Sequence, residues 1–243
     1  TPGTDGALSV LETNPLDKQA TYQFKNGKLL SVTGHASLNC PLAGSNNTYD
    51  TNGNLDTATD FNGNQVVHRY GPSGRLQQRI EAYGKPEART TTYVWDDAKN
   101  RVANVTVADA SGPLARTEYV YTTDGRLASE AVVNLSSKVP ASQNQSRQTT
   151  YTYTKHPNGV LATMGVDGPL PADTVTYSYD AYSNLTEVRN ALGHATTYSG
   201  YNALGLPGRI VGPNGAIREI LYDERGRMKE DRAIVSGVTK ATV

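Results

Sequence analysis

Residues that could form a metal site or a nucleophilic site are sparse and widely separated in this sequence. The single cysteine, Cys40, has no adjacent histidine that could activate its thiol. The four histidines, His35, His68, His156 and His194, lack the spacing of metal ligands. Aspartate-rich turns also lack the spaced ligands and closing glutamate of an EF-hand calcium loop. We therefore predict no catalytic residue, no metal site and no cofactor.

Tyrosine and arginine are the other side chains that could bind a ligand. Tyrosine rings can stack on sugars, or they can pack against one face of a sheet. The arginines that follow glycine turns, Arg75, Arg101, Arg126 and Arg227, could contact an anion. They could instead pair with a turn aspartate or stack on a neighbouring tyrosine. We expect the structural role for both residue types.

The composition limits the partners and the core of the protein. The chain has 243 residues with 23 basic and 23 acidic side chains, so no net field attracts nucleic acid or an anionic membrane surface. Apolar residues make up only 37%, but there are 15 tyrosines, which predicts a thin sheet with half-exposed faces. No apolar run is long enough for a membrane helix. The N-terminus has no methionine and no signal-peptide pattern, so we expect a piece of a longer protein.

A short motif, Tyr-Asp-x-x-Gly, recurs along the chain with aromatic residues 21 to 32 positions apart. Repetition of one motif indicates a small structural unit copied many times, and it disfavours an enzyme. The residues that define the repeat are Tyr49, Asp50, Gly53, Tyr70, Gly74, Arg75, Tyr121, Gly125, Arg126, Tyr153, Tyr179, Asp180, Tyr201, Gly205, Tyr222, Asp223, Gly226 and Arg227.

The residues around this motif predict β-hairpins. Before the turns, aromatic and β-branched residues alternate, as in Thr150-Tyr-Thr-Tyr153, which is a strand pattern. Asp50 with Gly53 fits a type I turn closed by a left-handed glycine. A unit of about 21 residues therefore holds two strands and two turns. We predict an all-β fold, in which repetitive antiparallel β-hairpins form a coiled or spiralling β-sheet.

The repeat also divides the chain. Residues 1–20 carry no repeat signature and are expected to be a cap or a linker, and residues 21–243 form the repeat domain. Two segments read as loop insertions, Ala131–Gln148 and Gly165–Asp173. An open sheet has unpaired edges, so we predict either edge-to-edge self-association or edges covered by the insertion loops.

The pattern Tyr-x-Tyr-Asp-x-x-Gly-Arg-Leu resembles the YD repeat, also called the Rhs repeat, of bacterial Rhs proteins, insecticidal toxin-complex proteins and teneurins. The resemblance spans about Thr21 to Met228, with Gly-Arg-Leu or a near variant at Gly74, Gly125 and Gly226. Two copies depart from the pattern: the segment Tyr153–Gly159 indicates a longer turn, and Ser183 stands where glycine is expected. These two turns are expected to be distorted.

The resemblance implies a partial shell wall built from a spiralling sheet, which encloses a C-terminal toxin domain of a secreted or cell-surface protein. The partners would be further repeats and the cargo domain of the same polypeptide, with no nucleic acid and no membrane. The alternative is an extracellular module that binds carbohydrate or a partner protein through exposed tyrosines.

Overall fold

The computed structural model describes residues 5–34, 44–138, 140–235 and 238–242. Two residues considered above, His35 and Cys40, lie outside this part of the chain. The chain divides into two compact units. Unit 1 comprises Thr1–Glu118 and Val132–Gln145, and unit 2 comprises Tyr119–Ala131 and Ser146–Val243.

Every regular element is a β-strand, apart from one short 3-10 helix, among the residues described. The first ten strands are β1 (Ala7–Thr13), β2 (Gln19–Lys25), β3 (Lys28–Thr33), β4 (Gly44–Tyr49), β5 (Leu55–Thr59), β6 (Gln65–Tyr70), β7 (Leu76–Glu81), β8 (Arg89–Asp96), β9 (Arg101–Asp109) and β10 (Gly112–Tyr121). The others are β11 (Leu127–Asn134), β12 (Ser146–Lys155), β13 (Leu161–Asp167), β14 (Val175–Tyr179), β15 (Leu185–Asn190), β16 (Ala195–Ser199), β17 (Arg209–Val211), β18 (Ile217–Tyr222), β19 (Met228–Val235) and β20 (Val238–Thr242), with the helix η1 at Pro140–Ser142.

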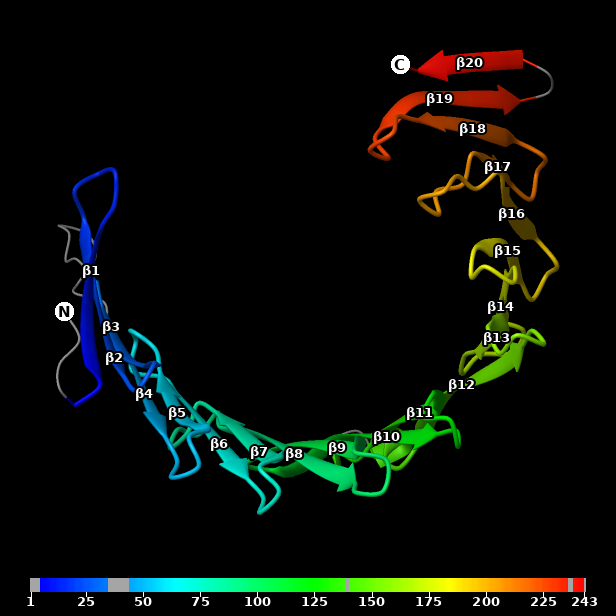
Figure 1. The fold of residues 1–243 in the computed structure, drawn as a ribbon. Coiled ribbons are helices and arrows are strands. Elements are labelled where there is room, and N and C mark those ends of the chain that lie inside the picture. The colour runs from blue at the N-terminus through cyan, green and yellow to red at the C-terminus, as the bar shows by residue number, and fades with distance from the viewer. Residues whose placement is uncertain (1–4, 35–43, 139, 236–237, 243) are drawn as a thin grey trace. The chain divides into compact units, whose positions relative to one another are not determined.

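Strands pair with their neighbours in sequence (Figure 1). In unit 1 each strand from β1 to β9 is antiparallel to the strand that follows it. In unit 2 the same holds from β12 to β19. The prediction of an all-β fold made of repeated antiparallel hairpins is therefore confirmed.

The strand alternation places aromatic and aliphatic side chains on one face of the sheet. In unit 2 the cross-strand register puts Tyr153 beside Met164, then Tyr177, then Val188. Nearest neighbours in such a row contribute about 0.2–1 kcal/mol each. The sheet is thin, as predicted. In the described part of the chain, the only buried apolar side chains are those of Val67 and Ile220.

The repeated turn is built as the Asp-x-x-Gly pattern predicts. At Asp50 the carbonyl accepts the Gly53 N–H at 2.9 Å, and Gly53 has a φ of +87°. The Asp50 carboxylate accepts the backbone N–H groups of Asn52 and Asn54 at 2.9 and 2.8 Å. Strand β5 has one residue more than β4 at this point, which produces a bulge between Thr48 and Tyr49 in the β4–β5 register. Aspartate thus satisfies backbone donors that the turn leaves unpaired.

The two turns expected to be distorted have the ordinary geometry. Ser183 adopts a φ of +71° and its N–H bonds to the Asp180 carbonyl at 3.1 Å, as glycine would. The turn after Tyr153 is not longer: it runs from His156 to Gly159, and the Gly159 N–H bonds to the His156 carbonyl at 2.8 Å. Strand β12 continues to Lys155, so the strand is lengthened and the turn is unchanged.

The left-handed backbone at Ser183 should lower the stability of the folded protein. An L-residue in this conformation costs about 1–2 kcal/mol, whereas glycine costs about 0.5–1 kcal/mol in unfolded-chain entropy. Ser183→Gly should therefore raise the free energy of unfolding by about 0.5–1 kcal/mol, measured by urea denaturation. The matched control is Gly193→Ser, at an equivalent turn where φ is +82° and a Cβ would meet no atom within 4 Å. It should destabilise by a similar amount, and equal signs for the two variants would contradict this reading.

The N-terminal segment contains a hairpin that the sequence pattern does not reveal. Strands β1 and β2 pair from Ala7↔Lys25 to Thr13↔Gln19. Their turn has the repeat geometry, because the Asn14 side chain accepts the N–H groups of Leu16 and Lys18. Asp17, with a φ of +58°, takes the place of glycine. In the described residues β1 has no second partner strand, so edge-to-edge association stays a prediction.

Both predicted insertions are shorter than the sequence indicated. Ala131–Asn134 belongs to β11 and Ser146–Gln148 to β12, so the loop is 135–145. It folds back within unit 1, where the Leu114 carbonyl on β10 accepts the N–H groups of Leu135 and Ser136 at 2.9 and 3.1 Å. Gly165–Asp167 likewise belongs to β13. The residues at both ends of these loops continue the strands without aromatic residues, so the aromatic strand pattern does not mark them as strand.

Candidate functional site

Successive hairpins are joined by a recurring contact, which we call the aromatic latch. An aromatic side chain near the end of one strand donates a hydrogen bond from its polar tip to a backbone carbonyl of the preceding hairpin. Trp95 Nε1 donates to the Leu76 carbonyl at 2.8 Å. Further latches join Tyr49 to Leu29 at 2.9 Å, Tyr153 to Leu127 at 2.8 Å, Tyr201 to Leu185, and Tyr222 to Pro207 at 3.2 Å. The acceptor is the second residue after the left-handed turn residue.

A cation covers the ring in three of these latches. Arg126 lies 5.1 Å from the centre of the Tyr153 ring, and Arg75 lies 5.5 Å from that of Trp95. Lys28 is 5.1 Å from the Tyr49 ring. Each cation directly follows the turn glycine, so one short segment supplies both the cation and the carbonyl acceptor. A cation–π contact of this kind contributes about 0.5–1 kcal/mol at an exposed site.

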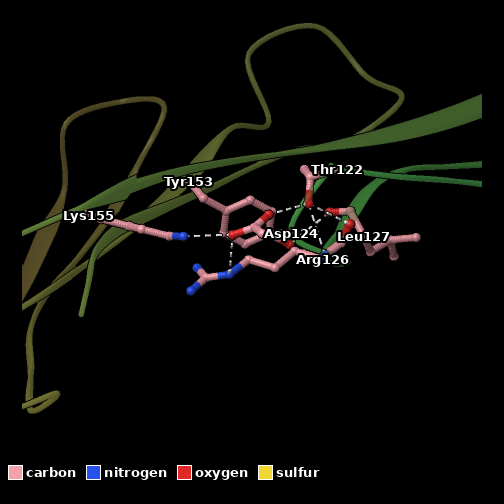
Figure 2. Close-up of polar contacts among 6 residues, drawn as sticks. All are labelled: Thr122, Asp124, Arg126, Leu127, Tyr153 and Lys155. Carbon is pink, nitrogen blue, oxygen red and sulfur yellow. Dashed lines mark hydrogen bonds and ion pairs between the residues drawn. The ribbon is translucent and has the colours of Figure 1, made fainter. Parts of the chain in front are cut away.

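Figure 2 shows the latch at Tyr153 together with its ionic surroundings. The Asp124 carboxylate accepts hydrogen bonds from Lys155 Nζ at 2.8 Å and from Thr122 Oγ1 at 2.6 Å. Arg126 Nε forms an ion pair with it at 3.6 Å. The hydrogen bond from Lys155, followed by that from Thr122, lowers the pKa of Asp124 to about 2. Burial of the ring raises the pKa of Tyr153 above its usual value. The phenol therefore stays protonated and keeps its donor.

Additional contacts join neighbouring turns. Lys28 Nζ donates to the Gly53 carbonyl at 2.8 Å, and Arg75 forms an ion pair with Asp97. In unit 2, His156 Nε2 lies 2.8 Å from the Tyr179 carbonyl and Asn158 donates to the Ala181 carbonyl at 3.1 Å. The turns thus bond to one another and not only to their own strands.

These contacts place the arginines and tyrosines considered in the sequence. Arg75 and Arg126 lie over aromatic rings, and Arg227 pairs with Asp223 at 2.7 Å. All three adopt roles expected of structural arginines. The Tyr70 ring stacks on His68 with a 6.5 Å separation between ring centroids. The Tyr179 carbonyl accepts a hydrogen bond from His156 Nε2. Tyr49, Tyr153, Tyr201 and Tyr222 form latches.

Sequence reasoning missed two parts of the latch. Lys28 acts as the cation of the first latch, and its signal was the segment Asn26-Gly-Lys-Leu29, a variant of Gly-Arg-Leu. The backbone carbonyl acceptors have no signal in residue identity, because any residue supplies a carbonyl.

The described residues contain no cluster of three or more histidine, cysteine, aspartate or glutamate side chains that could hold a metal. No helix in this part of the chain has the length and hydrophobicity needed to span a bilayer. One surface hollow of about 480 Å³ is lined by residues that include Gln77, Tyr93, Asp97 and the latch residues Arg75 and Trp95. The guanidinium of Arg75 and the N–H of Trp95 are already engaged in the latch.

The turn aspartates should make the stability of the protein depend on pH. Hydrogen bonds lower the pKa values of Asp50, Asp60, Asp180 and Asp223. A lowered folded-state pKa stabilises the protein above the unfolded value of about 3.9, and this stabilisation is lost as the pH falls through the folded value. The free energy of unfolding should therefore fall as the pH is lowered below about 4, measured by urea denaturation at several pH values.

Asp60→Asn is the matched test, because Asn190 and Asn202 already form the same backbone hydrogen bonds with neutral amides. This variant should show a shallower loss of stability in acid. A pH profile equal to that of the parent protein would contradict a role for the Asp60 carboxylate.

Comparison with known proteins gives a family match in unit 2. The family model described as RHS Repeat matches residues 179–217. No curated protein matches the sequence. A solved Tc holotoxin pore from Photorhabdus luminescens is 14% identical with a TM-score of 0.44, covering 93% of this chain and 14% of that one.

Two further solved structures are similar to this chain. A TcdB2–TccC3 structure without its hypervariable C-terminal region is 13% identical with a TM-score of 0.27, covering 97% of this chain and 19% of that one. A porin-like protein from Bacteroides uniformis is 12% identical with a TM-score of 0.32, covering 100% and 96%. The chain thus spans less than a fifth of the two toxin chains.

Proposed function

Since this chain carries an RHS repeat at residues 179–217, we propose that it is a non-enzymatic wall segment of an Rhs-type shell. The shell encloses a C-terminal toxin or effector domain. In this role the sheet excludes proteases and solvent-borne partners from the cargo. The remaining repeats and the cargo belong to the same polypeptide, which is secreted or displayed on the cell surface.

The observation that supports this role best is the recurrence of the aromatic latch. Each latch joins one hairpin to the next with a side-chain hydrogen bond in addition to the backbone ladder. A single-layer sheet has almost no buried apolar core to hold it together. The latches therefore stabilise the contact between neighbouring hairpins in a thin wall.

The carbohydrate-binding alternative has weaker support. The tyrosines of the repeat are half-buried on the sheet, and several have their hydroxyl groups engaged in latches. The most exposed tyrosine is Tyr182, which is 87% exposed at a turn. A glycan array would favour this alternative only if binding occurs and is lost on Tyr182→Ala.

The wall function can be tested with the full polypeptide that contains this segment. The C-terminal domain should resist limited proteolysis within the intact polypeptide and be digested when produced alone. Trp95→Ala should make the enclosed domain more sensitive to protease, while Tyr182→Ala should not. Equal digestion rates for the attached and the isolated domain would refute containment.

A further inference from the structure

Asparagine is followed directly by glycine five times in this sequence, and each of these pairs lies in a turn. An asparagine–glycine pair can lose ammonia without an enzyme, because the glycine backbone nitrogen can attack the asparagine side-chain amide and close a succinimide ring. Glycine has no side chain to hinder this approach. The attacking nitrogen must first lose its proton, so a hydrogen bond donated by the glycine N–H slows the reaction.

The fold protects four of the five pairs in the same way. In each of them the glycine N–H donates to the carbonyl three residues earlier, at 2.8 to 3.0 Å. These pairs are Asn52–Gly53, Asn62–Gly63, Asn158–Gly159 and Asn214–Gly215. Two of the side chains are held as well, since Asn158 Oδ1 and Asn214 Oδ1 each accept a backbone N–H at 3.1 Å.

The fifth pair, Asn26–Gly27, lies in a different kind of turn. These two residues form the whole loop between β2 and β3. Both have a left-handed backbone, with φ values of +50° and +77°, as in a type I′ hairpin turn. Among the described residues the Gly27 N–H has no hydrogen-bond acceptor, and Asn26 and Gly27 are both exposed. The attacking nitrogen is therefore unrestrained in this pair alone.

We propose that Asn26 is a site of spontaneous deamidation, with water as the co-reactant. The Gly27 nitrogen gives its proton to a base in the solvent and forms a bond to Asn26 Cγ. The Cγ–Nδ2 bond breaks, and Nδ2 takes up a proton and leaves as ammonia. Water then opens the succinimide at one of its two carbonyls, which gives aspartate or isoaspartate. The net reaction converts an amide and water into a carboxylic acid and ammonia, with no change of oxidation state.

Both products should weaken the first latch. The new carboxylate lies two positions from Lys28, whose Nζ donates to the Gly53 carbonyl at 2.8 Å and lies 5.1 Å from the centre of the Tyr49 ring. A carboxylate competes strongly for this ammonium. Isoaspartate also adds a carbon to the backbone of a two-residue loop, and loop length sets the register of a hairpin. The pairing of Lys25 with Lys28 is therefore disturbed. This consequence is independent of the proposed wall function.

The test incubates the purified chain at mildly alkaline pH and follows each asparagine–glycine pair by peptide mapping with mass spectrometry. We expect the acid to form about tenfold faster at Asn26 than at the other four asparagines, because each of those pairs must first break a hydrogen bond. The control is the same chain unfolded in urea, in which all five pairs should convert at similar rates. Equal rates in the folded chain, or faster conversion at any of the other four pairs, would overturn the proposal.

Amide hydrogen exchange across β3 tests the effect on the latch. Exchange in the converted protein should be about tenfold faster than in the fresh protein. Asn26→Gln is the matched variant, because glutamine retains the amide but its longer side chain closes a ring far more slowly. Its exchange should stay unchanged through the same incubation. Freshly prepared Asn26→Asp adds the charge without lengthening the backbone, so it should show a smaller increase. Unchanged exchange in fully converted protein would also overturn the proposal.

Discussion

Trp95→Ala should lower the free energy of unfolding of this chain by about 2–3 kcal/mol. The ring is half-buried, so its loss removes part of the about 3–5 kcal/mol seen for fully buried aromatic residues. It also leaves the Leu76 carbonyl without the indole donor that lies 2.8 Å away, and it removes the ring beneath Arg75. Urea denaturation followed by far-UV circular dichroism measures the change.

Trp95→Phe separates the hydrogen bond from the packing, because phenylalanine retains an aromatic ring but has no donor. It should cost about 1–1.5 kcal/mol, the usual contribution of one hydrogen bond with a partly desolvated acceptor. Tyr182→Ala is the control, since that ring is 87% exposed, and it should change stability by less than about 0.5 kcal/mol. If Trp95→Ala behaves like this control, the latch does not stabilise the sheet.

The sequence was sufficient to predict the hairpin repeat because its turns depend on local chemistry. Asp50 and Gly53 act on backbone atoms within the same five residues, so a short pattern contains the whole interaction. The structural role of Arg75 was also predicted, because an arginine beside a glycine turn can stack on a neighbouring aromatic ring or pair with a turn aspartate. The hairpin at Asn14–Lys18 escaped detection because Asp17 replaces the expected glycine.

The latch could be predicted only in part, because its acceptor is a backbone carbonyl in another hairpin. The residue type at Leu127 does not indicate that its carbonyl bonds to Tyr153 26 positions later. That pairing depends on strand register, which bulges shift by one residue at the turns. The same limitation applies to glycines whose role is close backbone approach. The sequence does not show that Gly208, which directly precedes β17, lies against the backbone of Gly200.

Gly208→Ala should destabilise the protein by about 2–3 kcal/mol, because an alanine side chain has no room there. The Gly208 N–H bonds to the Gly200 carbonyl at 3.0 Å, and its own carbonyl accepts the N–H of the buried Ile220 at 2.9 Å. A Cβ at Gly208 would lie 2.8 Å from the Gly200 carbonyl oxygen. Since that oxygen belongs to the backbone, relief requires a shift of the ladder, and overpacking of this kind costs about 1–3 kcal/mol.

The matched control is Gly44→Ala, at a strand position where the new Cβ would lie 3.5 Å from the Val32 carbonyl oxygen, an ordinary contact. Both substitutions add one methyl group to a glycine whose φ lies outside the left-handed region. Gly44→Ala should therefore be neutral or slightly stabilising, because alanine loses less conformational entropy on folding than glycine. The difference between the two variants isolates the steric cost at Gly208, and it should appear as faster amide exchange at Ile220. Similar stabilities for the two variants would show that the ladder at Gly200 and Ile220 shifts at little cost.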